Sequence, residues 1–147
     1  KTENKHKKFK EKLNKKIAKA NLSDRIIFMD EISAENMPKV MSAISLLIAL
    51  PRYEGYGMTP LEALASGTPF VGSKTGYFEE FSSHGKYGSV VELEDVANAA
   101  KAVLHWLSKN DELDIFSEIS RKYILENYSI EQEVNGINKA YLSLLKD

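Results

Sequence analysis

The sequence predicts an α/β fold, in which a parallel β-sheet is flanked by helices. Short apolar runs rich in leucine and β-branched residues have the length of buried strands, and they occupy residues 25–29, 43–50, 68–72 and 88–93. Between and after them come stretches with apolar residues at helical spacing. This alternation favours a parallel sheet, because two parallel strands need a crossover between them that is usually a helix.

Helices are predicted between these strands and after the last one. The stretch 95–108 has apolar residues three and four positions apart, which places them on one face, with Trp106 at its packing edge. Asp95 is the first residue of this stretch. Similar spacing predicts further helices over residues 34–42, 112–127 and 130–145.

The most informative stretch is residues 52–73, which reads RYEGYGMTPLEALASGTPFVGS. Proline is tolerated in the first turn of a helix, and Pro60 therefore predicts a helix over residues 60–66. Gly67 suits the left-handed position that ends a helix. The stretch is therefore expected to form a glycine loop after the strand at 43–50, then a short helix, then the strand at 68–72.

This arrangement predicts a binding site for a phosphate. The amides at a helix N-terminus attract anions, and Gly55 and Gly57 allow the backbone to approach one closely. Glu54 and Glu62 lie on either side of that position. Since carboxylates repel phosphates, we expect these two to bind sugar hydroxyls, one on a ribose and the other on a hexose.

A second loop, residues 74–80, follows the strand at 68–72. Parallel sheets bind ligands at the carboxyl ends of their strands, where this loop lies. Gly76 is expected to allow close approach to such a ligand.

Glu54 and Glu62, within EGYGMTPLEALASGTPFVGS, resemble the E-x7-E signature of retaining glycosyltransferases of family 4. The resemblance covers about residues 20–145. It implies a Rossmann-like sheet and the carboxyl-terminal, donor-binding half of a two-domain GT-B enzyme. Residues 51–69 are similar to lipopolysaccharide-core mannosyltransferases, which implies transfer of a hexose such as mannose from GDP-mannose to a glycan or lipid-linked glycan.

The resemblance also implies roles for individual residues. Glu62 would hold the ribose hydroxyls, and Glu54 would face the donor sugar as the catalytic residue. The diphosphate would meet backbone amides of the loop, and neither a metal ion nor a cofactor is implied. The implied donor-binding residues are Glu54, Gly55, Tyr56, Gly57, Met58, Thr59 and Glu62.

The chain departs from the family pattern near its start. The donor half normally opens with a glycine-arginine loop and a nearby lysine, and nothing before Arg25 matches them. We therefore expect an N-terminally truncated domain without the acceptor domain, inactive by itself. Its parts would be a lysine-rich helix (1–20), an α/β core (25–93) and a helical tail (95–147), with sheet edges left unpaired.

Composition is consistent with one soluble domain. The chain has 147 residues, of which 43% are hydrophobic and 28% charged. It contains no cysteine, so it has no disulfide framework, and no apolar run approaches the roughly 20 residues that span a bilayer. We expect a cytoplasmic protein.

Charge is unevenly distributed along the chain. Residues 1–20 hold nine lysines and two glutamates, although the net charge is −1. Phe9, Leu13, Ile17 and Ala20 form a narrow apolar seam beneath the lysines. Two interpretations remain: a surface helix packed on the sheet, or a contact with an anionic membrane face or acidic partner. Nucleic acid is not expected, because no aromatic residues interleave with the lysines.

Two other classes of function fit parts of the sequence. One is a non-catalytic nucleotide-sugar-binding or regulatory module. The other is a phosphorylase on the same scaffold, which would need a lysine-bound pyridoxal phosphate, and no convincing site for it is visible. The sequence leaves open the base and sugar of the donor, the acceptor and the oligomeric state.

Overall fold

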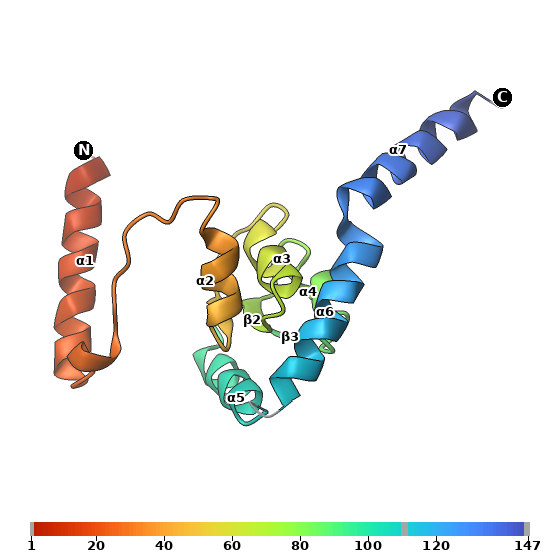
Figure 1. Cartoon of the computed structure of the whole chain (residues 1–147). Helices are drawn as coiled ribbons and strands as arrows, with labels where there is room; N and C mark the ends of the chain where they lie inside the picture. The colour runs from red at the N-terminus through yellow and green to blue at the C-terminus, as the bar shows by residue number, and fades with distance from the viewer. Residues whose placement is uncertain (1, 110–111, 146–147) are drawn as a thin grey trace. The chain divides into compact units, whose positions relative to one another are not determined.

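The computed structural model describes residues 2–109 and 112–145, with side chains from Lys7 onward. The chain forms two compact units, Lys1–Ser33 and Ala34–Asp147, which are considered separately (Figure 1). The predicted division at 1–20, 25–93 and 95–147 stays a prediction. Residues 25–33 belong to the same unit as the N-terminal helix.

The first unit contains helix α1 (Thr2–Lys19) and a 3-10 turn, η1 (Ser23–Arg25). Along the predicted apolar seam, Leu13 and Ile17 are half-buried, whereas Phe9 is exposed. The ammonium of Lys10 lies 5.4 Å from the centroid of the Phe28 ring. Lysines at spacings of four, three and four follow one side of the helix, and they are Lys8, Lys12, Lys15 and Lys19.

The predicted strand at residues 25–29 is wrong. This segment forms no strand, and the side chains of Ile27 and Met29 are 86% and 66% exposed. A strand needs a neighbour to pair with its backbone N–H and C=O groups, and none of the described strands pairs with this segment. Its apolar, β-branched composition was therefore not sufficient to make it part of the sheet.

The second unit contains the predicted parallel sheet. Its strands are β1 (Leu47–Ala49), β2 (Phe70–Ser73) and β3 (Gly88–Val91), in the order β1-β2-β3. Both pairs are parallel, and Phe70 lies opposite Leu47 on one side and Gly88 on the other. Every residue of the central strand β2 is buried. The predicted α/β class is confirmed.

Six helices flank or follow this sheet in the described residues. They are α2 (Met37–Ala43), α3 (Met58–Ala65), α4 (Phe78–Phe81), α5 (Val96–Leu107), α6 (Leu113–Tyr128) and α7 (Ile130–Leu144). Because α2 continues to Ala43, strand β1 is shorter than predicted. Helix α3 begins two residues before Pro60. Trp106, predicted at a packing edge, is buried, and its indole N–H donates to the Ser89 hydroxyl across 3.0 Å.

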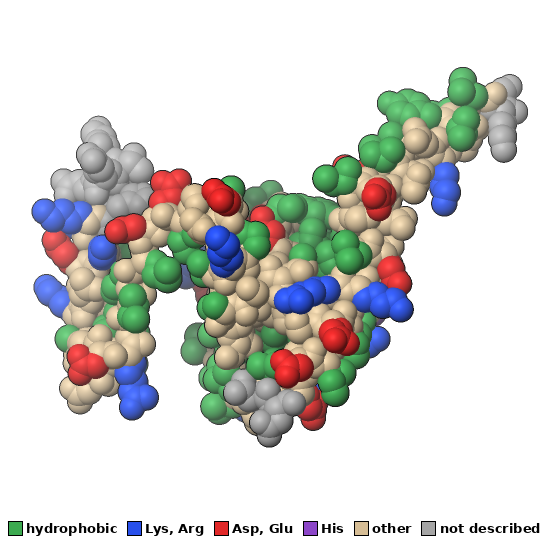
Figure 2. All heavy atoms as spheres, in the orientation of Figure 1, with side chains coloured by type: hydrophobic (Ala, Val, Ile, Leu, Met, Phe, Trp, Pro, Cys, Tyr) green, Lys and Arg blue, Asp and Glu red, His purple; other side chains and the backbone are tan. Residues whose placement is uncertain are grey.

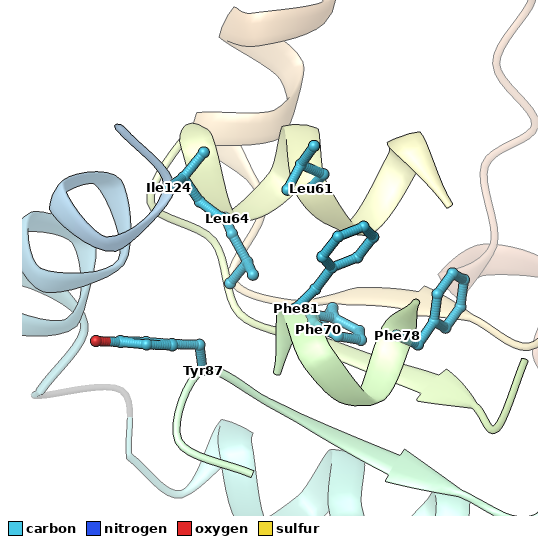
Figure 3. Packing of buried hydrophobic residues seen from close by; sticks show 7 residues of the cluster. All are labelled: Leu61, Leu64, Phe70, Phe78, Phe81, Tyr87 and Ile124. Carbon is cyan, nitrogen blue, oxygen red and sulfur yellow. The ribbon is translucent and has the colours of Figure 1, made fainter. Parts of the chain in front are cut away.

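The hydrophobic core lies between α3, α4, α6 and the sheet (Figure 3). Phe70 of β2 meets Phe78 of α4 edge to face, with ring centroids 5.9 Å apart. The cluster consists of Leu61, Leu64, Phe70, Phe78, Phe81, Tyr87 and Ile124. Helix α3 is therefore fixed by its buried side against this core.

Strand β1 and helix α7 of the second unit expose hydrophobic side chains to solvent. Strand β1 is at the edge of the sheet, and its Ile48 side chain is exposed. None of the residues of α7 is buried. Figure 2 shows hydrophobic side chains along this helix, among them Ile130, Val134, Ile137, Tyr141 and Leu144.

Candidate functional site

The loop between β1 and α3, residues 50–57, carries Glu54 and is called the motif loop below. At its start, the Ser73 hydroxyl of β2 donates a hydrogen bond to the carbonyl oxygen of Pro51. Arg52 forms an exposed ion pair with Glu94, with 2.7 Å between Nε and Oε1. The contacts connect the motif loop to the end of β2 and to the segment that follows β3, on the side of the sheet where parallel strands bind ligands.

Glu54 is half-buried, and hydrogen bonds hold its backbone and its side chain. Its N–H donates to the Thr75 hydroxyl across 3.1 Å. Its carboxylate accepts a hydrogen bond of 3.0 Å from the N–H of the next residue, Gly55. The other carboxylate oxygen, Oε2, forms no hydrogen bond within the described residues.

Residues 75–77, called the clamp here, touch the motif loop at three successive positions. Beside the Thr75 hydroxyl, the Tyr77 N–H donates to the carbonyl oxygen of Tyr56 across 3.1 Å. A Cβ on Gly76 would lie 2.9 Å from that same oxygen. Gly76, at φ +56°, therefore allows close approach to the motif loop itself. The predicted approach to a ligand stays untested.

Gly57 ends the motif loop in a left-handed conformation, with φ +104°. It is buried, and a Cβ there would overlap the ring of Phe78. Helix α3 begins at the next residue, and no side chain caps it. The N–H groups of Met58 and Thr59 therefore have no hydrogen-bond partner in the described residues. These two exposed donors carry the positive end of the helix dipole, which suits an anion.

Glu62 lies four residues after Met58, on the exposed side of α3. Neither its carboxylate nor the Thr59 hydroxyl forms a hydrogen bond or ion pair with the described part of the chain. The structure thus leaves a carboxylate, a hydroxyl and two amides free over the first turns of α3. Gly55, in contrast, has open space around the position of a Cβ.

The other end of α3 is held by α6, a contact that the sequence did not reveal. Gly67 adopts the predicted left-handed conformation, with φ +85°. It lies against Ser117 of α6, which would overlap a Cβ at that position. The Arg121 guanidinium donates to the carbonyl oxygen of Ser66 across 2.8 Å. An arginine that reaches back over 55 positions leaves no local pattern in the sequence.

Two basic side chains, one in the motif loop and one next to the clamp, are engaged in ion pairs. Lys74, next to the clamp, lies 3.3 Å from Glu92. This hydrogen bond and the charge of Glu79 raise the pKa of Lys74, which therefore stays protonated. Arg52 is paired with Glu94. Within the described residues, no three histidine or acidic side chains are grouped closely enough to hold a metal ion.

A family model described as glycosyl transferases group 1 matches residues 6–140. The chain belongs to this family. The family is enzymatic, and the resemblance stated from the motif is confirmed. None of the helices in the described residues is long and apolar enough to cross a membrane.

Among curated relatives, the chain is similar to the lipopolysaccharide core biosynthesis mannosyltransferase LpsB of Rhizobium meliloti (strain 1021). The two are 34% identical over 143 residues, which is 96% of this chain and 40% of LpsB. The chain thus spans about two fifths of the length of that relative.

Two solved structures have the same GT-B fold. One is the C-terminal domain of the glycosyl transferase group 1 protein LpcC from Francisella tularensis, with a TM-score of 0.74 and 24% identity; the match covers 84% of this chain and 64% of that one. The other is Anabaena HepE in complex with UDP, with a TM-score of 0.81 and 18% identity; the match covers 93% of this chain and 37% of that one.

Proposed function

We propose that this chain is the donor-binding portion of a retaining glycosyltransferase that transfers a hexose, with mannose favoured, to a glycan. The observation that carries the proposal is the uncapped start of α3. There, the free amides of Met58 and Thr59 lie between two glutamates, Glu54 and Glu62.

In the proposed complex the diphosphate of a nucleotide sugar accepts hydrogen bonds from those two amides and from the Thr59 hydroxyl. The dipole of α3 stabilises the negative charge that grows on the diphosphate as the sugar leaves. Glu62 binds the ribose hydroxyls. Glu54, held by the clamp, faces the hexose as the catalytic residue, and Gly55, Tyr56 and Gly57 complete the binding loop.

GDP-mannose is the proposed donor, and no metal or cofactor is needed. The name of LpsB, a lipopolysaccharide core mannosyltransferase, supports mannose and a lipid-linked glycan acceptor. The UDP bound to HepE supports a nucleoside diphosphate as the ligand class. We place the reaction at the cytoplasmic face of a membrane, where α1 would make peripheral contact, and the complete protein would supply the acceptor site.

Calorimetric titration with GDP, UDP, GDP-mannose and UDP-glucose tests the donor site. We expect GDP to bind more tightly than UDP, and Glu62→Ala to weaken GDP binding by about tenfold, the loss of one good hydrogen-bonded contact. Glu54→Gln should leave the affinity for GDP unchanged and reduce only the additional affinity for GDP-mannose. The exposed acid Glu118 of α6 serves as a control, and Glu118→Ala should bind as the wild type does.

Activity is tested with the full-length gene product, because this chain spans only about two fifths of the length of LpsB. Release of GDP from GDP-mannose that depends on a glycan acceptor supports the proposal. Binding without turnover under the same conditions would instead indicate a regulatory nucleotide-sugar-binding module. Failure of every nucleotide to bind the folded chain would overturn the donor site itself.

A further inference from the structure

A hollow of about 600 Å³ lies between the motif loop and the junction of α6 with α7. Tyr56 and Met58 line it on one side, and the other side is formed by Asn127, Tyr128, Ser129, Gln132 and Glu133. Its volume falls within the range of small-molecule sites, about 300 to 1,000 Å³. The hollow adjoins the start of α3, because Met58, the first residue of that helix, is part of its lining.

The ring of Tyr56 is a fixed aromatic surface at this hollow. It packs against Tyr77 and Phe81, with centroid distances of 5.1 Å and 5.2 Å. Phe81 in turn meets Tyr128 edge to face at 5.2 Å. Tyr56 nevertheless remains 44% exposed. A ring that is held by its neighbours and still open to solvent loses little conformational entropy when a ligand stacks on it.

The opposite wall supplies hydrogen-bonding groups without a cation. In the described residues, the side chains of Gln132 and Glu133 form no hydrogen bond or ion pair. Asn127 donates its amide to the carbonyl oxygen of Tyr123 across 2.8 Å, which leaves its own oxygen as an acceptor. Burial and a hydrogen bond with Tyr123 raise the pKa of Tyr128, whose phenol therefore stays neutral.

These features select the chemical class of the ligand. Among the described residues that line the hollow there is no lysine or arginine, and Glu133 adds a negative charge, so the hollow offers no cationic side chain to a phosphate or carboxylate. A sugar ring matches both walls: its C–H face stacks on the electron-rich face of an aromatic ring, and its hydroxyls bond to amides and carboxylates. We propose that this hollow binds a neutral hexose unit of a glycan, stacked on Tyr56 and hydrogen-bonded to Gln132 and Glu133.

The proposal extends the proposed function and rests on it for the identity of the glycan. We assign such a hexose to the acceptor or product, because the proposed function places the diphosphate of the nucleotide sugar on the amides of Met58 and Thr59. Tyr56 would then serve two purposes: its backbone belongs to the donor loop and its ring contacts the glycan. Binding at the proposed glycan site is therefore expected to change binding at the proposed donor site, because Tyr56 belongs to both.

The test is a titration of the chain with α-mannotriose in the absence of nucleotide, monitored by the NMR signals of the protein. We expect millimolar binding that shifts the signals of Tyr56 and Gln132 and is insensitive to salt. Tyr56→Ala should weaken binding at least tenfold and Glu133→Gln severalfold, whereas Tyr56→Phe should retain it. Tyr141→Ala removes an exposed aromatic ring outside the hollow and should bind as the wild type does.

A parallel titration with GDP separates the two proposals. Absence of mannotriose binding in a sample that binds GDP would overturn the glycan site alone. Mannotriose binding that survives Tyr56→Ala in a folded variant, or that Tyr141→Ala abolishes, would also overturn it. If the chain bound mannotriose but not GDP, the proposed donor site would be overturned and the proposed glycan site would be supported.

Discussion

The Thr75 hydroxyl accepts a hydrogen bond from the N–H of Glu54, across 3.1 Å and 21 positions of sequence. This contact joins the loop after β2 to the loop after β1, at the residue proposed to face the donor sugar. The clamp therefore positions a group that belongs to a different strand. A residue with this role acts through Glu54, and its loss should affect recognition of the sugar rather than of the nucleotide.

Thr75→Val tests this positioning role. Valine has nearly the same shape but no acceptor, so the half-buried Glu54 N–H loses its partner, at a cost of about 1–3 kcal/mol. We expect GDP to bind as in the wild type, while the additional affinity for GDP-mannose is lost. Thr75→Ser keeps the acceptor and should restore that affinity. Equal losses for GDP and GDP-mannose would point to general damage to the loop and contradict the prediction.

Gly57→Ala should damage the start of α3. An alanine at φ +104° is strained by about 1–2 kcal/mol, and its methyl group would overlap the ring of Phe78. The midpoint of thermal unfolding should therefore fall, and GDP binding should be lost. Gly55→Ala is the matched control, because its methyl group would enter open space and should leave stability unchanged. If both variants were equally stable, the assigned conformation of Gly57 would be wrong.

Asp95 should make the stability of α5 depend on pH. Its carboxylate accepts hydrogen bonds from the backbone N–H and the side-chain amide of Asn98, at 3.0 Å and 2.6 Å, and the backbone bond is the main cause that lowers the pKa of Asp95. A lowered folded pKa means that the stabilisation is present above the unfolded pKa, about 3.9, and is lost as the pH falls through the folded value.

Asp95→Ala should therefore lower the thermal midpoint at pH 7, and its difference from the wild type should shrink in acid. Asp95→Asn keeps an oxygen that can cap the helix and should lie between the two at pH 7. Circular dichroism melts at neutral and acidic pH measure both variants. A wild-type advantage that does not decline as the pH falls below the unfolded pKa, about 3.9, would show that the carboxylate is not responsible.

The lysines along one side of α1 should bind anionic membranes; they are Lys8, Lys12, Lys15 and Lys19. At about 1 kcal/mol for each lysine near the surface, reversing three charges should reduce partitioning onto phosphatidylglycerol vesicles by at least ~100-fold. The variant replaces Lys8, Lys12 and Lys15 by glutamate. The control makes the same change in net charge at Lys101, Lys122 and Lys139. Co-sedimentation that is unaffected by salt, or equally reduced in both variants, would contradict the prediction.

Local sequence signals identified most of the second unit, because they depend on neighbours within a few residues. Pro60 indicated the start of α3 to within two positions, and Gly67 indicated its left-handed end. The signals failed for residues 25–29. This segment has the composition of a strand, but none of the described strands pairs with it. Hydrophobic composition indicates only that a segment can be buried. Strand pairing also depends on whether another strand lies beside the segment.

By itself, the sequence determined the α/β class, the existence of a helix around Pro60 and the family to which the chain belongs. Those features follow from residue periodicity and from backbone conformations that few residue types tolerate. Only the tertiary structure decided that Thr75 holds Glu54, that Arg121 secures the end of α3 and that Tyr56 and Gln132 line the same hollow. These pairs lie 21 to 76 positions apart, and such distances leave no periodic trace in a single sequence.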